Sequence, residues 1–202
     1  MVLWFIMTLL TLAGIFFLGY ALGNISPSYI VGKRAGGIDI REKGSGNAGA
    51  TNVMRVLGWR FGLLVFVLDA LKGLAAVSIG MWLGGYSGLA AAALGVIIGH
   101  DFPVLLKFRG GKGIASSTGI LMGLFPVPTL IGVLVFLLVV RSTRMVSLGS
   151  LVFVLGMALY AVISGQPAAL ALLAVSLALF AFIRHRENIR RILAGQENML
   201  SY

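Results

Sequence analysis

Cysteine is absent from this 202-residue chain, which excludes disulfides, thiolate catalysis and cysteine-ligated metals. Histidine occurs only at His100 and His185, which leaves little for a zinc site. The six acidic residues are scattered, whereas metal-assisted phosphotransfer normally needs clustered carboxylates to hold Mg²⁺. Charged residues make up 11% of the chain and hydrophobic residues 59%, with a mean hydropathy of +1.02. Because soluble domains rarely reach such values, we expect an integral membrane protein.

Long apolar runs divide the chain into candidate membrane spans. They cover residues 2–23, 61–83, 89–106, 114–140, 146–163 and 168–183. The first has no basic segment before it and no cleavage signal after it, so we expect a retained transmembrane helix rather than a signal peptide. The fourth is interrupted by FPVP at residues 125–128, where proline blocks helix propagation. Splitting it there gives seven helices instead of six.

The first half of that split run is short. It extends about 18 Å at about 1.5 Å per residue, against a hydrocarbon core of about 30 Å. We expect it to include the preceding glycine-rich residues, to tilt in a thinned bilayer, or to be re-entrant.

Basic residues predict the orientation. The formal charge of +10 suits phosphates or an anionic leaflet, and it also follows from the positive-inside rule alone. With seven spans and the N-terminus outside, every basic loop and the arginine-rich tail lie inside. The outer turns GGYSG, FPVP and SGQP carry no charge. We therefore predict an all-α polytopic membrane protein of about seven helices, some short or broken, forming one domain over residues 1–202 with a cytoplasmic C-terminus.

Three polar segments fall on the predicted cytoplasmic face. The first, residues 32–52, contains GSGNAG, which matches the dinucleotide pattern G-x-G-x-x-G. No strand precedes it and no βαβ unit fits, so the match has no such meaning. Instead, glycine backbone N–H groups and a helix beginning after residue 49 favour an anion. A flexible glycine linker is the alternative. The candidate ligands are Lys33, Arg41, Ser45, Asn47, Thr51 and Asn52.

The second segment, residues 99–119, contains FRGGKG, a glycine-rich turn with two cations that runs into a helix. It is not a Walker A loop, because the pattern G-x-x-x-x-G-K-[ST] does not fit and a hydrophobic Ile114 follows Gly113. An anion-binding nest is the better interpretation, and a tight turn at the membrane interface is the alternative. The candidate ligands are Lys107, Gly110, Gly111, Lys112, Gly113 and Ser116.

The third segment, residues 184–198, is predicted to be helical, with Arg184, Asn188 and Arg191 on one face and His185 beside Asn188. An amphipathic surface tail is the alternative. Within the spans, Asp69 and Lys72 are i,i+3 neighbours, either a neutralising structural pair or part of a site. With His100, all these groups are expected to converge at the cytoplasmic edge of the bilayer.

Such a site suits a substrate with a solvated phosphate and a tail in lipid, either in phosphate transfer or in acyl transfer onto a phosphorylated alcohol. The His-x-x-x-x-Asp pattern of acyl-CoA-dependent acyltransferases is absent, because Leu105 and Arg190 stand five residues after the histidines. A phosphate transporter or a noncatalytic scaffold is the rival interpretation. The outer half has no polar groups to complete a transport path, and a scaffold leaves the matching loops unexplained.

The segments GSGNAGATN after IDIR, GHDFP with FRGGKGIA, and RHRENIRR, together with FVLDALKG, resemble the bacterial acyl-phosphate-dependent glycerol-3-phosphate acyltransferase family. They occur in the family's order over nearly the whole chain. The family often has Gly-Ser-Ile where this chain has Gly-Asn24-Ile, and Ala-Thr where it has Ala-Ser116. We therefore assign the catalytic serine to Ser45.

The resemblance implies transfer of an acyl group from acyl phosphate to glycerol 3-phosphate, without coenzyme A or another cofactor. It further implies a bacterial inner-membrane protein with a cytoplasmic active site, in contact with membrane lipids and with an enzyme that supplies acyl phosphate, and no nucleic-acid partner. The implied catalytic residues are Arg41, Ser45, Asn47, His185 and Asn188, with glycerol 3-phosphate on the loop from Gly110 to Gly113. Lys72, His100 and Arg184 complete the expected binding set.

We hypothesise direct attack of the glycerol hydroxyl on the acyl carbonyl, with no acyl-enzyme. A phosphate oxygen of the substrate, His100 or His185 takes the proton.

Overall fold

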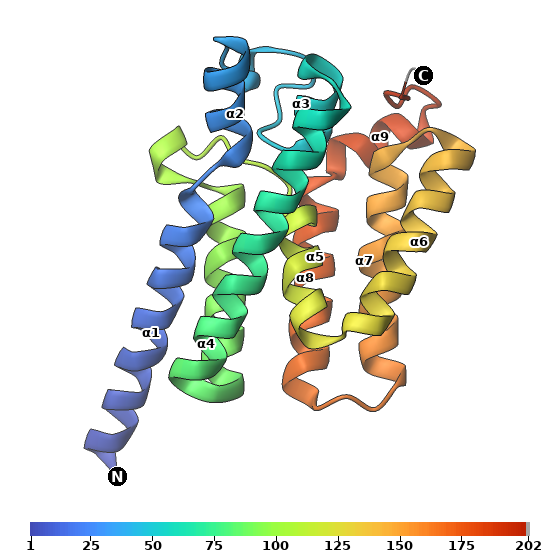
Figure 1. Ribbon diagram of the computed structural model, residues 1–202. Coiled ribbons are helices and arrows are strands. Elements are labelled where there is room, and N and C mark those ends of the chain that lie inside the picture. Colours follow the sequence, from blue (N-terminus) through green and yellow to red (C-terminus); the bar gives the residue numbers. More distant parts are fainter. Residues whose placement is uncertain (201–202) are drawn as a thin grey trace. The chain divides into compact units, whose positions relative to one another are not determined.

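A computed structural model of the chain describes residues 1–200, which form helices joined by turns (Figure 1). The predicted all-α class is therefore confirmed for this part of the chain. The helices group into two compact units, unit 1 over residues 1–123 and unit 2 from Leu124 onward.

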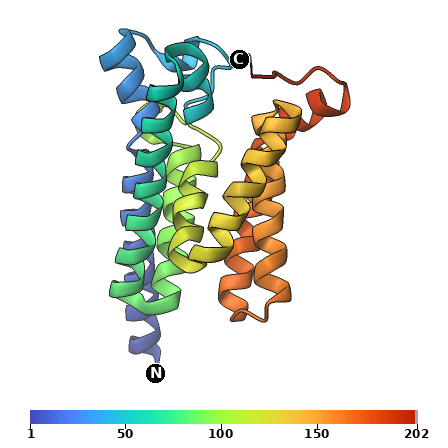
Figure 2. The same cartoon turned by 45° about the vertical axis from the view of Figure 1, so that its right-hand side comes forward.

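Unit 1 contains a long helix that folds back on itself. Its elements are α1 (Val2–Asn24), α2 (Pro27–Gly36), η1 (Ile40–Glu42), α3 (Ala50–Leu57), α4 (Trp59–Asp101), η2 (Val104–Leu106) and α5 (Ile114–Leu124). An unbroken α4 would be about 65 Å long, twice the bilayer core. Non-helical backbone at Gly84 and Gly85 splits it, and Gly80 then packs on Gly88 across two arms, residues 59–83 and 86–101 (Figures 1 and 2). These arms occupy the predicted second and third spans.

Glycines let α1 lie directly on the second arm of α4. Gly19 and Gly23 of α1 abut the backbone of Ala92 and Val96, while Gly95 and Gly99 of α4 abut that of Phe16 and Tyr20. Small residues four apart allow this approach in membranes, where van der Waals contact replaces the hydrophobic effect. The C-terminal ends of α1 and α4 are thereby held together.

The short helix α5 is enclosed by protein. It has 11 residues, and those from Ala115 to Leu121 are buried. Gly119 lies against the carbonyl of Ala70, and Gly73 of α4 lies against the carbonyl of Ser116. A helix surrounded in this way is shielded from lipid whatever its length. The helix is interrupted at Phe125, and α6 begins at Pro126, as the proline pattern predicts.

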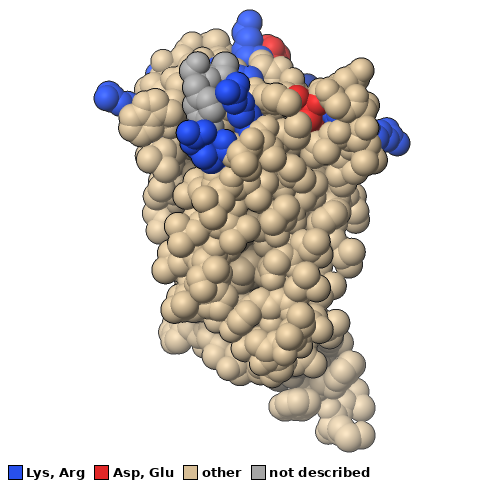
Figure 3. Space-filling view, turned by 90° about the vertical axis from the view of Figure 1, so that its right-hand side faces the viewer, with Lys and Arg blue, Asp and Glu red and all other residues tan. Residues whose placement is uncertain are grey.

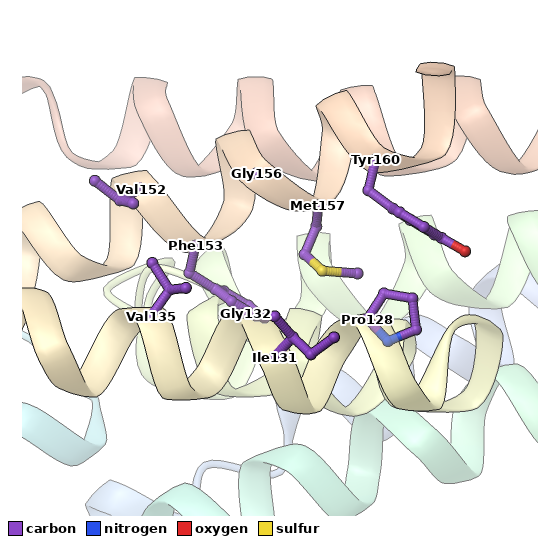
Figure 4. Close-up of a pocket in the computed structure, with 9 residues that line it drawn as sticks. All are labelled: Pro128, Ile131, Gly132, Val135, Val152, Phe153, Gly156, Met157 and Tyr160. Carbon is purple, nitrogen blue, oxygen red and sulfur yellow. The ribbon is translucent and has the colours of Figure 1, made fainter. Parts of the chain in front are cut away.

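Unit 2 is built from α6 (Pro126–Thr143), α7 (Val146–Ile163), α8 (Ala168–Arg184) and α9 (Arg186–Leu193). Gly132 and Gly156 leave an apolar groove of about 280 Å³ between α6 and α7, lined also by Phe153 and Met157 (Figure 4). The pair α8 and α9 is bent by 63° at His185. The expectation that Arg184 shares a helical face with Asn188 and Arg191 is therefore wrong, because Arg184 ends α8 and the other two lie on α9.

Within residues 1–200, four helical stretches are long and apolar enough to cross a membrane, and the bent pair α8–α9 would be a fifth. One of the four, residues 59–106, contains the reversal at Gly84 and Gly85. On the face shown in Figure 3, Lys and Arg gather at one end and leave a long surface without charge. The number of spans and the sides on which the termini lie stay predictions.

One boundary differs from the sequence expectation. The third span was expected to continue to residue 106, but α4 ends at Asp101. Pro103 lacks the N–H that would continue the helix and disfavours helical backbone at the residue before it.

Replacing Gly119 by alanine should destabilise the protein, because the added Cβ collides with the carbonyl of Ala70 on α4. We expect a loss of about 1–3 kcal/mol in unfolding free energy, measured as a lower thermal midpoint in detergent. The matched control is Gly14→Ala, a helical glycine of α1 with nothing within 4 Å of its Cβ position. Equal midpoints for the two variants would contradict the packing described for α5.

Candidate active site

The first glycine-rich turn of unit 1, loop 1 (residues 43–49), is held by a buried asparagine. Asn52, on the first turn of α3, accepts a hydrogen bond from Ser45 N at 2.8 Å. Its amide nitrogen donates to Ile40 O at 2.9 Å and to Lys43 O at 3.0 Å. Gly44 and Gly46 have positive φ values of 58° and 72°, which glycine adopts without strain. In this structure the Asn52 amide therefore fixes the loop, and the Ser45 side chain is exposed.

Arg41 connects the segment before loop 1 to the second glycine-rich region. Its Nε and Nη2 donate to the two carboxylate oxygens of Asp39 at 3.0 and 2.6 Å, and its Nη1 donates to Leu106 O at 2.7 Å. The guanidinium also lies 5.2 Å from the centroid of the Tyr29 ring. The Arg41 hydrogen bonds hold the pKa of Asp39 down at about 2, against an opposing effect of burial. The pair is thus ionised at neutral pH.

The second turn, loop 2 (residues 107–113), folds back on the end of α4. Lys107 and Phe108 adopt left-handed backbone, uncommon for residues with side chains, and Phe108 N donates to Pro103 O at 2.9 Å. Gly111 N donates to His100 O at 3.0 Å. A Cβ on Gly111 would collide with the His100 ring and lie 3.0 Å from Ala48 O of loop 1. Gly111 therefore fits between the imidazole and loop 1.

Beneath loop 2 lies a buried cluster of ionisable groups. Lys72 Nζ is 2.7 Å from Asp69 Oδ1 and 2.9 Å from His100 Nδ1, and it also contacts two carbonyls at the end of α1. His100 Nδ1 is 3.3 Å from Asp69 Oδ1. The i,i+3 pairing predicted for Asp69 and Lys72 is confirmed. His100, which Lys72 contacts and whose carbonyl accepts from Gly111 N, connects this pair to loop 2.

The structure brings loop 1, loop 2 and the buried cluster together within unit 1, as the convergence argument predicts for these segments. The predicted ligands differ in exposure. Ser45, Lys33 and Lys107 are exposed, while Asn47, Thr51 and Lys112 are partly buried. Ser116 is completely buried in α5. Lys33 lies over the Tyr29 ring, 5.9 Å from its centroid.

In unit 2 the predicted residues stand at the bend between α8 and α9. The Nδ1 atom of His185 is 2.8 Å from Ala181 O, and His185 is 3% exposed. Asn188 donates to Glu197 Oε1 at 2.6 Å. Arg184, in the last turn of α8, is partly buried. His185 thus stands at the bend and Asn188 in the first turn of α9, both buried.

Three residues to which the sequence analysis gave no role have partners near these segments. Glu197 also accepts from Ser147 at 3.0 Å and Arg191 at 2.9 Å. Burial opposes ionisation of Glu197, but these donors outweigh it and lower its pKa. Asp39 holds Arg41, a pairing that the spacing Asp-x-Arg in IDIR could have suggested. Asn24, which replaces the family's serine, accepts from Leu105 N at 3.4 Å and donates to Tyr20 O at 2.8 Å. No sequence pattern predicts Leu105 as a partner of Asn24, or the partners of Glu197, because they come from other elements.

Chemically, unit 1 offers an anion site at the end of α4. Gly111 lies against the buried His100, Arg41 donates to Leu106 O just before loop 2, both loops contain glycines with positive φ, and loop 2 carries three cationic residues. Such a set binds phosphate groups and stabilises negative charge that develops on a reacting oxygen.

Comparison with known proteins gives a consistent result. The sequence profile of the family described as glycerol-3-phosphate acyltransferase matches residues 13–195. Glycerol-3-phosphate acyltransferases of Thermoanaerobacter sp. (strain X514) and Clostridioides difficile (strain 630) are 45% and 46% identical over 183 and 187 residues. These matches cover 91% and 90% of this chain, and 92% and 91% of the relatives.

Solved structures agree. The fold is similar to that of PlsY (YgiH), an integral membrane glycerol 3-phosphate acyltransferase, in its glycerol 3-phosphate form, with a TM-score of 0.88 and 35% identity. That match covers 94% of this chain and 96% of the other. The lysophosphatidic acid form of PlsY gives a TM-score of 0.87 at 35% identity, covering 94% of this chain and 95% of the other. The chain is an integral membrane acyltransferase and belongs to the glycerol-3-phosphate acyltransferase family.

Proposed function

We propose that the protein transfers an acyl group from acyl phosphate to the 1-hydroxyl of glycerol 3-phosphate, giving 1-acylglycerol 3-phosphate and phosphate. The observation that carries the proposal is the contact between the two glycine loops, with Gly111 placed between His100 and Ala48. It supports a site for two phosphate-bearing substrates, one on loop 2 and one near Arg41. The lysophosphatidic acid form of the similar PlsY structure also supports it.

The reaction needs little from the protein beyond positioning and charge stabilisation. The 1-hydroxyl oxygen attacks the acyl carbonyl carbon, an ester bond forms, and the bond from carbon to the phosphate oxygen breaks. Acyl phosphate is a mixed anhydride with a good leaving group, so no acyl-enzyme is required. Arg41 and the donors Ser45 and Asn47 stabilise the oxyanion and the departing phosphate. The hydroxyl proton passes to a substrate phosphate oxygen or to a histidine.

The binding of glycerol 3-phosphate is assigned to Gly110, Gly111, Lys112 and Gly113 of loop 2. His185 and Asn188 complete the reacting centre, and Lys72, His100 and Arg184 contribute further to binding. The protein acts as one domain in the bacterial inner membrane with its site on the cytoplasmic face. There it receives acyl phosphate from the enzyme that makes it. Acyl phosphate has an apolar tail and a reactive anhydride, so it is best transferred at the membrane surface.

Purified protein in a lipidic medium should form lysophosphatidate and phosphate from glycerol 3-phosphate and palmitoyl phosphate, and neither from palmitoyl-CoA. Ser45→Ala should lower kcat by about 100-fold, as removal of one oxyanion donor does elsewhere. Product analysis by mass spectrometry together with phosphate release measures both.

The matched control is Ser87→Ala, an exposed serine at the turn between the arms of α4, which should leave the rate unchanged. Product from palmitoyl-CoA alone would contradict the assigned donor. An acyl ester trapped on Ser45 would contradict direct attack.

Asp39→Asn should lower kcat/KM by about tenfold, because the Arg41 guanidinium loses a charged partner at both Nε and Nη2. The lowered pKa of Asp39, about 2, means that the ion pair stabilises the fold above about pH 4 and loses this effect as pH falls toward 2. The rate ratio of wild type to variant should therefore be constant from about pH 6 to 9.

Steady-state kinetics across that pH range measure the ratio. Glu42→Gln is the control, since it removes the same charge from an exposed neighbour of Arg41 and should have little effect. If the two variants behave alike, Asp39 does not position Arg41.

A further inference from the structure

We propose that the buried Asp69–Lys72 pair fixes His100 as a neutral imidazole protonated on Nε2, so that it donates a hydrogen bond at loop 2 and does not serve as the general base. The inference rests on the proposed function in so far as loop 2 binds glycerol 3-phosphate. His100, one of the candidate proton acceptors, is then a hydrogen-bond donor, and Asp69 and Lys72 are positioning residues.

The first step is the hydrogen-bonding capacity of Lys72. Its ammonium has three N–H donors and no lone pair. Its three hydrogen bonds go to His100 Nδ1 at 2.9 Å, Ile25 O at 3.0 Å and Gly23 O at 3.3 Å, while Asp69 Oδ1, 2.7 Å away, is its ion-pair partner. Oxygen atoms of this kind only accept, and the contact with His100 is satisfied only if Nδ1 accepts as well. Nδ1 therefore has no proton, and the proton of a neutral ring is on Nε2.

The second step excludes the other protonation states. An imidazolium, or a neutral ring protonated on Nδ1, would place an N–H group against an ammonium 2.9 Å away, with Asp69 Oδ1, at the longer distance of 3.3 Å, as its one acceptor there. Lys72, Asp69 and His100 are at most 9% exposed, so water does not screen such a repulsion. Asp69 neutralises Lys72, and the carbonyls at the C-terminal end of α1 add a favourable partial charge. The ammonium stays in place, and with it the proton on Nε2.

The third step places Nε2 at loop 2. A Cβ at Gly111 would collide with His100 Nε2 and lie 2.8 Å from Cε1, so this edge of the ring lies against the loop. The same residue holds the loop through the bond from Gly111 N to His100 O at 3.0 Å. An N–H at this position stabilises an anion on the loop and does not accept a proton from the glycerol hydroxyl. The proton acceptor is then a substrate phosphate oxygen or His185.

The protonation state can be read directly, because the chain has only two histidines. Protein with ring-¹⁵N histidine is prepared in lipid nanodiscs as wild type and as His185→Gln, which leaves only the His100 signals. At neutral pH we expect Nδ1 at the shift of an unprotonated nitrogen and Nε2 at that of a protonated one. Lys72→Met should move the proton to Nδ1, facing Asp69. Protonated Nδ1 in the otherwise unmodified cluster would overturn the proposal, and this result does not depend on Lys72→Met folding.

Kinetics separate a donor from a base. His100→Ala should raise the KM for glycerol 3-phosphate about tenfold with kcat within about twofold, the effect of one lost hydrogen bond. His100→Gln, whose amide nitrogen reaches the position of Nε2, should restore most of the lost affinity. A base would instead lose about 10² to 10⁴ in kcat, and glutamine would not restore it. That outcome would overturn the donor role.

The two proposals fail separately. If wild-type protein forms no product with either acyl donor, the proposed function is wrong, whereas the ¹⁵N shifts still decide whether Asp69 and Lys72 set the protonation of His100. If the enzyme is active and the shifts show a protonated Nδ1, the inference is wrong and the function stands.

Discussion

The ammonium of Lys72 binds three segments of unit 1 at a depth where little water is available to solvate it. It pairs with Asp69 one turn earlier on the first arm of α4, contacts His100 on the second arm, and donates to Gly23 and Ile25 at the end of α1. A charge buried in a membrane span costs several kcal/mol unless its partners satisfy it. These partners lie on α1 and on both arms of α4, so all the contacts form together only when the ends of these helices are arranged in one way. Loop 2 starts from that arrangement, since it bonds to the backbone of His100.

Close backbone approach makes this network possible. Lys72 reaches the α1 carbonyls because α1 lies directly on α4 through glycines such as Gly23 and Gly99. The same property recurs at Gly111, where a side chain would displace the imidazole or loop 1. Glycine therefore serves packing in the spans and anion access in the loops. In both places the residue is needed for the absence of Cβ, and in loop 1, at Gly113 of loop 2 and at Gly85 between the arms of α4 it also has a positive φ.

The sequence predicts the parts of this structure that depend on local properties. Apolar runs, the break before Pro126 and the i,i+3 pairing of Asp69 with Lys72 follow from hydropathy, proline stereochemistry and helical geometry. The bend at His185 does not, because arginine and asparagine would extend a helix equally well. Likewise the partners of Asn52 and Glu197 are a loop backbone and residues on other elements, and no spacing encodes them. Asn52 illustrates the difference. It was predicted as an anion ligand at the first glycine-rich segment, and it does lie beside loop 1, but its amide bonds to the protein backbone.

The two histidines show how neighbours, rather than residue type, decide what a side chain can do. His185 Nδ1 is 2.8 Å from a carbonyl oxygen, which only accepts, so Nδ1 carries a proton. His100 Nδ1 faces an ammonium, which only donates, so its proton is on Nε2. The same atom, Nδ1, is thus a hydrogen-bond donor in one ring and an acceptor in the other. A sequence comparison sees two histidines in two motifs, whereas a carbonyl and a lysine give them opposite chemistry.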